Sequence, residues 1–178
     1  MKKKVRMSRV NTRNVSRSSG SKKVRWLAMI VCIAIPLFAG FIGSFFTSSN
    51  IPVWYEGLNK PSFTPPAQVF PVVWTTLFVL MGIALYIVYV SPKGKTRTMA
   101  LRLFGIQLGL NIIWSILFFG MRRPEYALIE IVLLWISILM TMIYFRKVDR
   151  KTTGYLLLYI IWVSVASVLN YTIVALNP

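Results

Sequence analysis

The chain has 178 residues, of which 56% are hydrophobic and only 14% charged, with 21 Lys and Arg against four Asp and Glu. A soluble domain carries about 25% charged residues, and a disordered chain is poor in aromatic residues. Both classes are excluded, because 14% of this chain is aromatic. With no His and one cysteine, Cys32, the chain lacks the usual ligands for zinc or haem and the histidine of a nucleophile–base pair. The composition therefore predicts an integral membrane protein with no metal site.

The basic residues are concentrated at the N-terminus. Ten of the 21 lie in residues 1–25, which contain no acidic residue and no apolar periodicity, so we predict a disordered basic tail. Two interpretations stay open: the tail binds anionic membrane lipids, or it is a solvated segment that sets the topology. Nucleic acid is not an expected partner, because no aromatic residue interleaves the charges. The Arg- and Ser-rich composition also allows a minority interpretation as an organelle transit peptide.

Five long apolar segments follow this tail. Each is long enough to cross a bilayer as a helix, which needs about 20 residues, and runs containing Pro, Gly or charge separate them. We expect Pro36 to kink the first helix and Pro124 to occupy the first turn of the fourth. Residues 26–178 are therefore predicted to form an all-α bundle of five transmembrane helices. The predicted spans are 26–46, 67–90, 99–119, 124–145 and 154–176.

The cations outside the tail predict the orientation of the bundle. Segments 91–102 and 146–151 hold four Lys or Arg each, whereas the opposite loops hold only Lys60, Arg122 and Arg123. By the positive-inside rule, we expect the N-terminus in the cytoplasm and the C-terminus outside, in the cell membrane. An organelle membrane is the alternative that a transit peptide would imply.

The first outer loop, about residues 47–66, is aromatic and rich in proline. Pro61, Pro65 and Pro66 fall within six residues, and Trp54 and Tyr55 precede them. Prolines restrict the backbone, so the segment is unlike a flexible linker and favours a rigid lid over the outer mouth of the bundle. The alternative is a belt of aromatic residues at the membrane surface.

Aromatic and polar residues share faces of three predicted helices, at about 100° per residue. The second, third and fifth helices each present such a face. Its members are Trp74, Leu77 and Phe78; Asn111, Trp114 and Phe118; and Trp162, Ala166 and Leu169. Periodicity alone does not decide whether these faces line a cavity, pack in the core or face lipid. Gly105 and Gly109 lie on the opposite side of the third helix, as a seam for a dimer or for another helix of the same bundle.

The few polar residues inside the spans should face the bundle interior. We expect Asn111 and Asn170 to hydrogen-bond to each other, to backbone carbonyls of other helices, or to a ligand. Glu130 lies about two turns into the fourth helix. It is either a favourable acid near the helix N-terminus or a partner of Arg122 or Arg123.

Several of these residues form one longer pattern. The loop matches W-Y-x-x-L-x-K-P-x-(W/F)-x-P-P from Trp54 to Pro66 and continues into Val69–Trp74. The third helix contains Leu110-Asn111, Trp114 and Phe118-Phe119-Gly120, and the fifth contains Trp162, Ala166 and Leu169-Asn170-Tyr171. In this order, from about Pro36 to the end of the chain, the residues resemble the TspO/MBR family of tryptophan-rich sensory proteins and translocator proteins.

The resemblance implies a five-helix bundle with an internal pocket that opens toward the first loop. It implies protoporphyrin IX or a related tetrapyrrole as ligand, no obligatory cofactor, and a homodimer. By resemblance, residues from the loop and from four helices form the pocket wall. They are Tyr55, Trp74, Leu77, Phe78, Asn111, Trp114, Phe118, Tyr126, Leu133, Trp162, Ala166 and Leu169.

Three functions follow as alternatives from the resemblance. The first is a receptor or sensor for porphyrins and other flat hydrophobic molecules, linked to tetrapyrrole handling and stress responses. The second is an enzyme that degrades porphyrins in light and oxygen, with Trp74 and Trp162 as candidate photochemical residues. The third is a transporter of porphyrins or small hydrophobic molecules. Sterol binding is not expected, because no cation follows Leu169-Asn170-Tyr171.

Overall fold

The computed structural model describes residues 13–52 and 54–178, with side chains from residue 24 on. These residues form five long helices and no strand: α1 (Arg13–Ser48), α2 (Val69–Val90), α3 (Lys95–Ser115), α4 (Pro124–Val148) and α5 (Thr152–Leu176). A 3₁₀ turn, η1 (Tyr55–Gly57), lies in the first loop, and a π-helical turn, η2 (Ile116–Gly120), continues α3. All five helices contain a stretch long and apolar enough to cross a membrane, so the predicted all-α, five-span architecture is confirmed.

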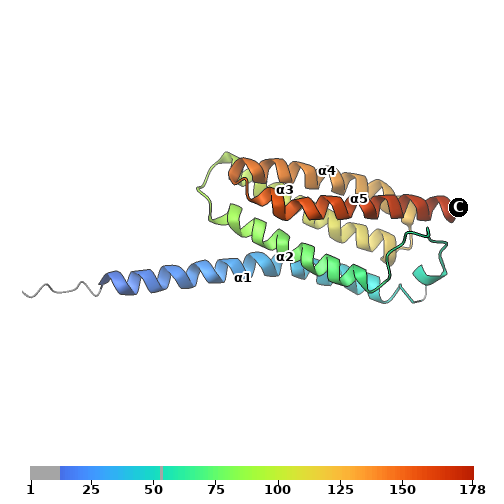
Figure 1. Ribbon diagram of the computed structural model, residues 1–178, viewed down its shortest axis with the longest axis horizontal. Coiled ribbons are helices and arrows are strands. Elements are labelled where there is room, and N and C mark those ends of the chain that lie inside the picture. Colours follow the sequence, from blue (N-terminus) through green and yellow to red (C-terminus); the bar gives the residue numbers. More distant parts are fainter. Residues whose placement is uncertain (1–12, 53) are drawn as a thin grey trace, which may run out of the picture.

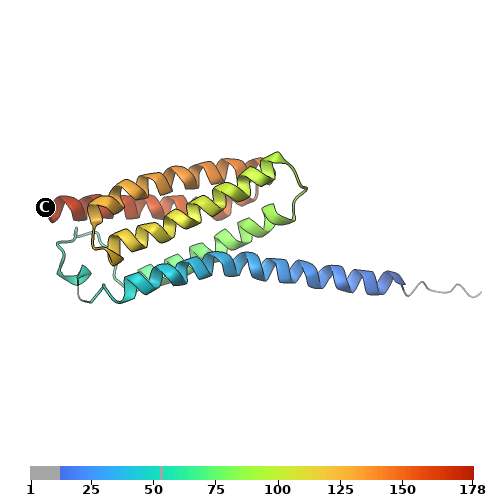
Figure 2. The ribbon, with the colours of Figure 1, turned by 180° about the vertical axis from the view of Figure 1, so that it is seen from behind.

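The five helices lie side by side, and their connections alternate between the two ends of the bundle (Figure 1). Helix α4 packs against α3 on one side and α5 on the other, while α1 packs against α2 and α3. Seen from behind, α1 runs along the edge of the bundle and extends past the other helices (Figure 2). It continues through Pro36 as one curved helix rather than two broken segments.

The start of α1 differs from the prediction. The helix begins at Arg13, so residues 13–25 are helical although we expected a disordered tail up to residue 25. Adding residues to an existing helix costs much less than nucleating one, and Lys and Arg are good helix formers. The apolar span that follows can therefore carry the helix back into the basic segment. Residues 1–12, the rest of the predicted tail, lie outside the described residues.

Helices α1 and α2 cross closely at Gly82. A Cβ atom at this position would lie 2.9 Å from the carbonyl oxygen of Cys32 and against the backbone of Ile33. Only a glycine fits there without moving the α1 backbone. This close crossing brings the C-terminal half of α1 to the face of α2 that carries Trp74 and Phe78.

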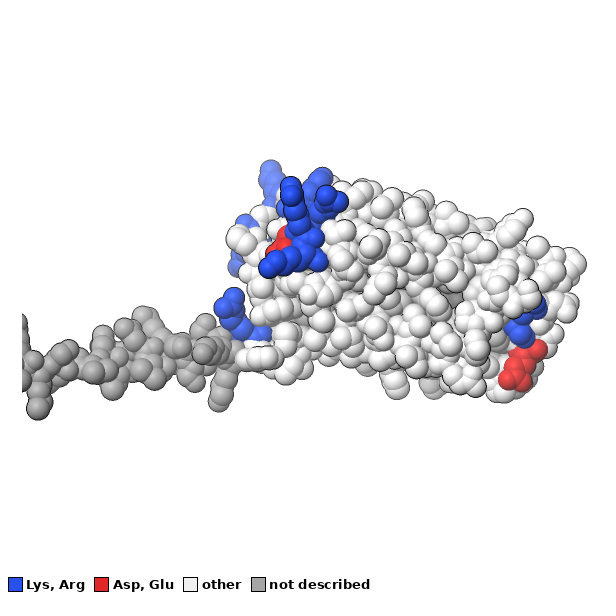
Figure 3. Space-filling model, viewed as in Figure 1, with Lys and Arg blue, Asp and Glu red and all other residues white. Residues whose placement is uncertain are grey.

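The surface is divided by charge along the long axis. On the face shown in Figure 3, Lys and Arg gather at the end that holds the α2–α3 and α4–α5 connections, a few charges lie at the other end, and the surface between is uncharged. Large apolar side chains such as Phe45, Ile129 and Leu158 are exposed in this middle band. Such a band suits hydrocarbon rather than water. The chain is thus a multi-pass membrane protein.

Candidate ligand-binding cavity

A cavity of about 460 Å³ lies between α1, α2, α3 and α5, beneath the first loop. This volume is within the range of ligand pockets, about 300–1,000 Å³. The faces predicted on α2, α3 and α5 all contribute to its wall. The predicted residues that border it are Tyr55, Trp74, Phe78, Asn111, Trp114, Phe118, Trp162, Ala166 and Leu169.

The structure corrects the other three assignments. Leu77 is buried in the helix core, with 3% of its surface exposed, but does not border the cavity. Tyr126 and Leu133 are each 54% exposed and lie on the outer surface of α4. They are seven residues apart and so share one helix face, which points away from the bundle. Helix α4 contributes no lining residue, whereas α1 contributes several.

Helix α1 supplies a wall that sequence reasoning missed. Its lining includes Gly40, Gly43, Ser44 and Thr47, which follow one helix face at i, i+3, i+4 and i+7. The signal was therefore present in the sequence as a face of small residues. The two glycines let other helices approach closely, since the Phe78 ring fills the place of a Cβ atom at Gly40 and the Ser115 hydroxyl lies 3.0 Å from one at Gly43.

Aromatic side chains form two groups around the cavity. On one side Trp114 stacks on Phe118 with ring centres 5.0 Å apart, and Tyr55 from the loop approaches Phe119 at 5.7 Å. On the other side Trp74 stacks on Phe78 at 5.6 Å, and Phe70 meets the edge of Trp162 at 5.7 Å. The cavity therefore presents aromatic surfaces from opposite directions.

The π-helical turn η2 carries two consecutive phenylalanines to the cavity. Phe118 and Phe119 are both buried and both border it. A π turn adds a residue to the helical repeat and frequently marks a functional site. Phe119 was not among the predicted lining residues.

Buried polar side chains of α3 and α5 are connected by hydrogen bonds across the cavity floor. Asn111 Nδ2 donates to Tyr159 Oη at 3.2 Å, and Tyr159 Oη donates to Gln107 Oε1 at 3.0 Å. Trp114 Nε1 donates to Asn170 Oδ1 at 3.1 Å. Asn170 Nδ2 donates to the Pro124 carbonyl oxygen at 2.8 Å, so the predicted bond to a backbone carbonyl is confirmed for Asn170. Asn111 and Asn170 do not bond to each other.

The indole N–H of Trp162 differs from these groups. Its Nε1 atom is buried and has no hydrogen-bond partner among the described residues, although other atoms of Trp162 border the cavity. A buried donor without a partner costs about 1–3 kcal/mol.

The first loop is held in place at its centre. Lys60 Nζ donates to the carbonyl oxygens of Tyr55, Glu56 and Leu58 at 2.9, 3.0 and 3.2 Å. Asn59 N donates to Asn177 Oδ1 at 2.9 Å, and Asn177 Nδ2 donates back to the Asn59 carbonyl oxygen at 3.0 Å. These bonds attach the loop to the end of α5, as a lid requires. Tyr55 belongs to this loop, and burial of its side chain raises the pKa of the phenol.

The arginines at this end do not pair with Glu130. Arg123 forms a salt bridge with Glu125 at 3.3 Å, and Arg122 donates to Asn50 Oδ1 at 3.1 Å. Glu130 is buried instead, because it lies on the α4 face that packs against α3 and α5. The predicted pairing of Glu130 with Arg122 or Arg123 is therefore wrong.

The glycine seam of α3 faces outward. Nothing lies within 4 Å of a Cβ atom built on Gly105 or Gly109, so no helix of the same chain packs there. The prediction of an internal packing seam is wrong, and the prediction of a dimer seam stays untested.

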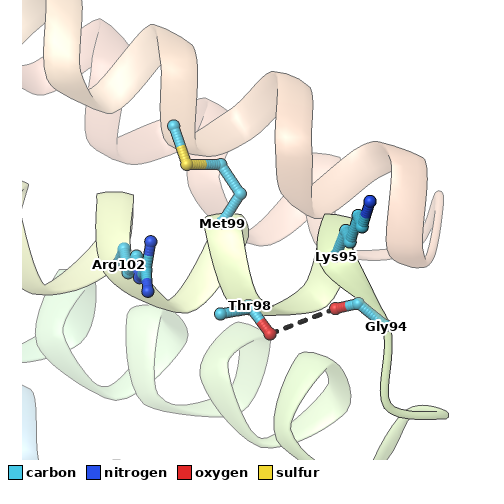
Figure 4. A pocket seen from close by; sticks show the side chains of 5 residues that line it. All are labelled: Gly94, Lys95, Thr98, Met99 and Arg102. Carbon is cyan, nitrogen blue, oxygen red and sulfur yellow. Dashed lines mark hydrogen bonds between the residues drawn. The ribbon is translucent and has the colours of Figure 1, made fainter.

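A second, open pocket lies at the start of α3, on the basic end of the bundle. Gly94, Lys95, Thr98, Met99 and Arg102 line it (Figure 4). The four helical residues share one face of α3, and Thr98 Oγ1 donates to the Gly94 carbonyl oxygen at 3.1 Å. Two cations and one apolar side chain thus line this pocket.

Comparison with known proteins agrees with this architecture. The model of the TspO/MBR family matches residues 32–176, which include the C-terminal part of α1 and all of α2 to α5. The chain belongs to the TspO/MBR family. The predicted family is therefore confirmed, and the match begins after the basic N-terminal segment.

Relatives within the TspO/MBR family align along most of their length. The tryptophan-rich protein TspO of Chlorobaculum tepidum is 46% identical over 153 residues, which are 85% of this chain and 97% of the relative. The tryptophan-rich protein TspO of Archaeoglobus fulgidus is 40% identical over 151 residues, 85% of this chain and 97% of the relative. The human translocator protein is 32% identical over 150 residues, 83% of this chain and 89% of the relative.

Proposed function

We propose that this TspO/MBR protein is a membrane receptor for flat hydrophobic molecules of the porphyrin class, such as protoporphyrin IX. The observation that carries the proposal is the convergence of Trp74, Trp114 and Trp162 from three helices on one cavity. Indole and phenyl faces bind a flat macrocycle by stacking and by apolar burial. The cavity volume of about 460 Å³ is within the range of ligand pockets.

The acidic side chains of such a ligand would lie toward the loop. Lys60, Arg122 and Arg123 are the cations at this end, and both arginines follow η2, which borders the cavity. Arg122 and Arg123 hold only exposed partners, whereas Lys60 already donates to three carbonyl groups. We therefore assign the propionates mainly to the two arginines. Replacing all three cations by Gln should weaken binding of protoporphyrin IX at low salt, and unchanged affinity would contradict this orientation.

Fluorescence quenching tests the receptor proposal directly. Protoporphyrin IX, titrated in darkness into the purified protein in detergent, should quench the fluorescence of Trp74, Trp114 and Trp162 with saturation. A variant with all three replaced by Phe should bind more weakly when affinity is measured by porphyrin absorbance. A non-saturating signal in both proteins would show partitioning into detergent instead of binding to a site.

One observation favours the enzyme alternative enough to test it. Trp162 borders the same cavity as the Trp74–Phe78 stack, where an excited porphyrin would lie against its indole ring. Illumination in the presence of oxygen should then bleach bound protoporphyrin IX, and Trp162→Phe should slow the bleaching without loss of binding in the dark. Equal bleaching rates in the two proteins would contradict a photochemical role of Trp162. The transport alternative predicts porphyrin flux across vesicles, which the same preparations can measure.

The remaining partners are proposed from the surface. Lys95 and Arg102 suit anionic lipid headgroups at the basic end, which the positive-inside rule places in the cytoplasm together with the N-terminus. The outward-facing Gly105 and Gly109 suit a second copy of the chain.

A further inference from the structure

Glu130 is a carboxyl group buried within a transmembrane helix. Only 6% of its surface is exposed, and neither side-chain oxygen has a hydrogen-bond partner among the described residues. An unpaired carboxylate is costly in such surroundings, so a buried carboxyl is either paired with a cation or carries a proton. Both candidate cations at this end are engaged elsewhere, Arg123 with Glu125 and Arg122 with Asn50.

Glu130 lies behind the cavity wall. It is on the inner face of α4, which packs against α3 and α5, and these two helices carry Asn111, Trp114 and Asn170 on the cavity. Glu130 lies 18 residues before the end of α4 at Val148, and Asn170 lies 18 residues after the start of α5 at Thr152. Because the two helices are antiparallel and joined at these ends, Glu130 and Asn170 lie at a similar depth along the bundle. Tyr159 is near enough to feel the charge of Glu130.

The groups around Glu130 offer no compensating charge. Helix α5 presents the Tyr159 phenol and the Asn170 amide, and α3 presents the amides of Gln107 and Asn111. The cations of α3, Lys95, Arg97 and Arg102, lie in its first turns, at the opposite end of the bundle. Helix α2 and η2 contain no charged residue, and the α2 tyrosines, Tyr86 and Tyr89, also lie toward that opposite end.

We propose that Glu130 is an intramembrane proton-binding residue whose ionisation is coupled to an acidic ligand in the cavity. A carboxylate on one side of the α3–α5 wall and an anionic ligand on the other repel each other, because the packed helices between them screen the charges less than water would. Binding of the anion therefore draws one proton from the solvent onto Glu130, and ionisation of Glu130 expels the anion. The inference rests on the proposed receptor function, since it concerns ligands of the same cavity.

The test compares an acidic with a neutral porphyrin. Protoporphyrin IX and its dimethyl ester are titrated into the full-length protein between about pH 5 and about pH 9, a range that spans the ordinary carboxyl pKa and any raised value. The affinity for the diacid should fall as Glu130 ionises, by at most about tenfold per pH unit, which is the limit for one linked proton. The ester should bind with no such dependence.

Two variants assign the effect to Glu130. Glu130→Gln keeps the shape of the neutral acid and should remove the part of the pH dependence that Glu130 causes, leaving only the dependence due to the ligand's own carboxyl groups. Glu56→Gln, which removes an exposed carboxylate at the same end of the bundle, should leave the wild-type dependence unchanged. A pH dependence in Glu130→Gln equal to that of the wild type overturns the coupling.

Infrared spectroscopy provides a readout that needs no ligand. Without ligand, the wild-type protein at low pH should show a carboxylic-acid C=O stretch that is absent from Glu130→Gln and present in Glu56→Gln. In a second step, adding the diacid should extend this protein band to higher pH. If the band is absent at low pH, Glu130 binds no proton and the inference fails. If neither porphyrin binds while the band is present, the receptor proposal and the coupling fail, but proton binding by Glu130 stands.

Discussion

At the residue scale, Ala166 shows how one methyl group limits the cavity. It lies one helical turn from Trp162 on α5, and both border the cavity. A larger side chain at this position would occupy the space in which a flat ring meets the indole. The size of residue 166 is therefore a restraint on ligand shape that the aromatic residues alone do not impose.

We predict that Ala166→Thr weakens binding of protoporphyrin IX about tenfold, equivalent to about 1.4 kcal/mol, because the added methyl and hydroxyl groups enter an apolar wall. Absorbance titration in detergent measures the affinity. Ala175→Thr is the matched control, since Ala175 is exposed on the same helix and does not border the cavity. Equal affinities for the two variants would show that residue 166 does not contact the ligand.

A second residue-scale prediction concerns Gly82. Gly82→Ala should destabilise the protein by about 1–3 kcal/mol, the usual cost of overpacking, because the new Cβ would collide with the α1 backbone. Thermal unfolding in detergent, followed by circular dichroism, measures the loss. Gly154→Ala provides the comparison, since nothing lies within 4 Å of its Cβ position and alanine favours a helix. An unchanged midpoint in Gly82→Ala would contradict the close α1–α2 crossing.

At the element scale, α3 carries different chemistry on opposite sides. Asn111, Trp114 and Phe118 face the cavity, whereas Gly105 and Gly109 face outward beside the exposed Ile106 and Ile113. One face of α3 therefore lines the cavity, and the opposite face packs against no helix of the described chain. The π turn at the end of α3 adds Phe119 to the inner face, so a local irregularity of this helix enlarges the aromatic surface.

We predict that Gly105→Leu combined with Gly109→Leu shifts a dimer toward monomer, because close approach of two α3 helices requires small residues. Light scattering coupled to size-exclusion chromatography in detergent measures the oligomeric state. The outward position of both residues implies that porphyrin affinity stays unchanged. Wild type that is monomeric at all protein concentrations would rule out this seam as a stable interface.

At the scale of the whole molecule, the lid joins the first loop to the C-terminal residues over the cavity. The bonds between Asn59 and Asn177 connect residues 118 positions apart. They hold the loop against α5, while Tyr55 packs on Phe118 and Phe119 beneath it. Access to the cavity from this side therefore depends on contacts between the loop and the C-terminal residues.

We predict that Asn177→Ala accelerates dissociation of protoporphyrin IX severalfold, because it removes two hydrogen bonds that hold the lid, each worth about 0.5–1.5 kcal/mol. Stopped-flow fluorescence measures the rate, and hydrogen exchange should show faster opening of residues 54–60. Thr172→Val is the control, since Thr172 bonds only within its own helix, to the Val168 carbonyl. Equal dissociation rates in the two variants would mean that the ligand leaves by another route.

The sequence by itself determined the membrane class and the five helices. Apolar segments of bilayer length, separated by prolines, glycines and charges, are expected to form membrane-spanning helices. The helical period then places Trp74, Trp114 and Trp162 on defined faces of these helices. Which faces meet is a property of packing, and only the tertiary structure decided it. It placed α1 on the cavity in place of α4, with Tyr126 and Leu133 outside, because the Gly82 crossing brings α1 against α2. It also left Glu130 buried without a partner, since the arginines that the sequence places near it turn to Asn50 and Glu125 instead.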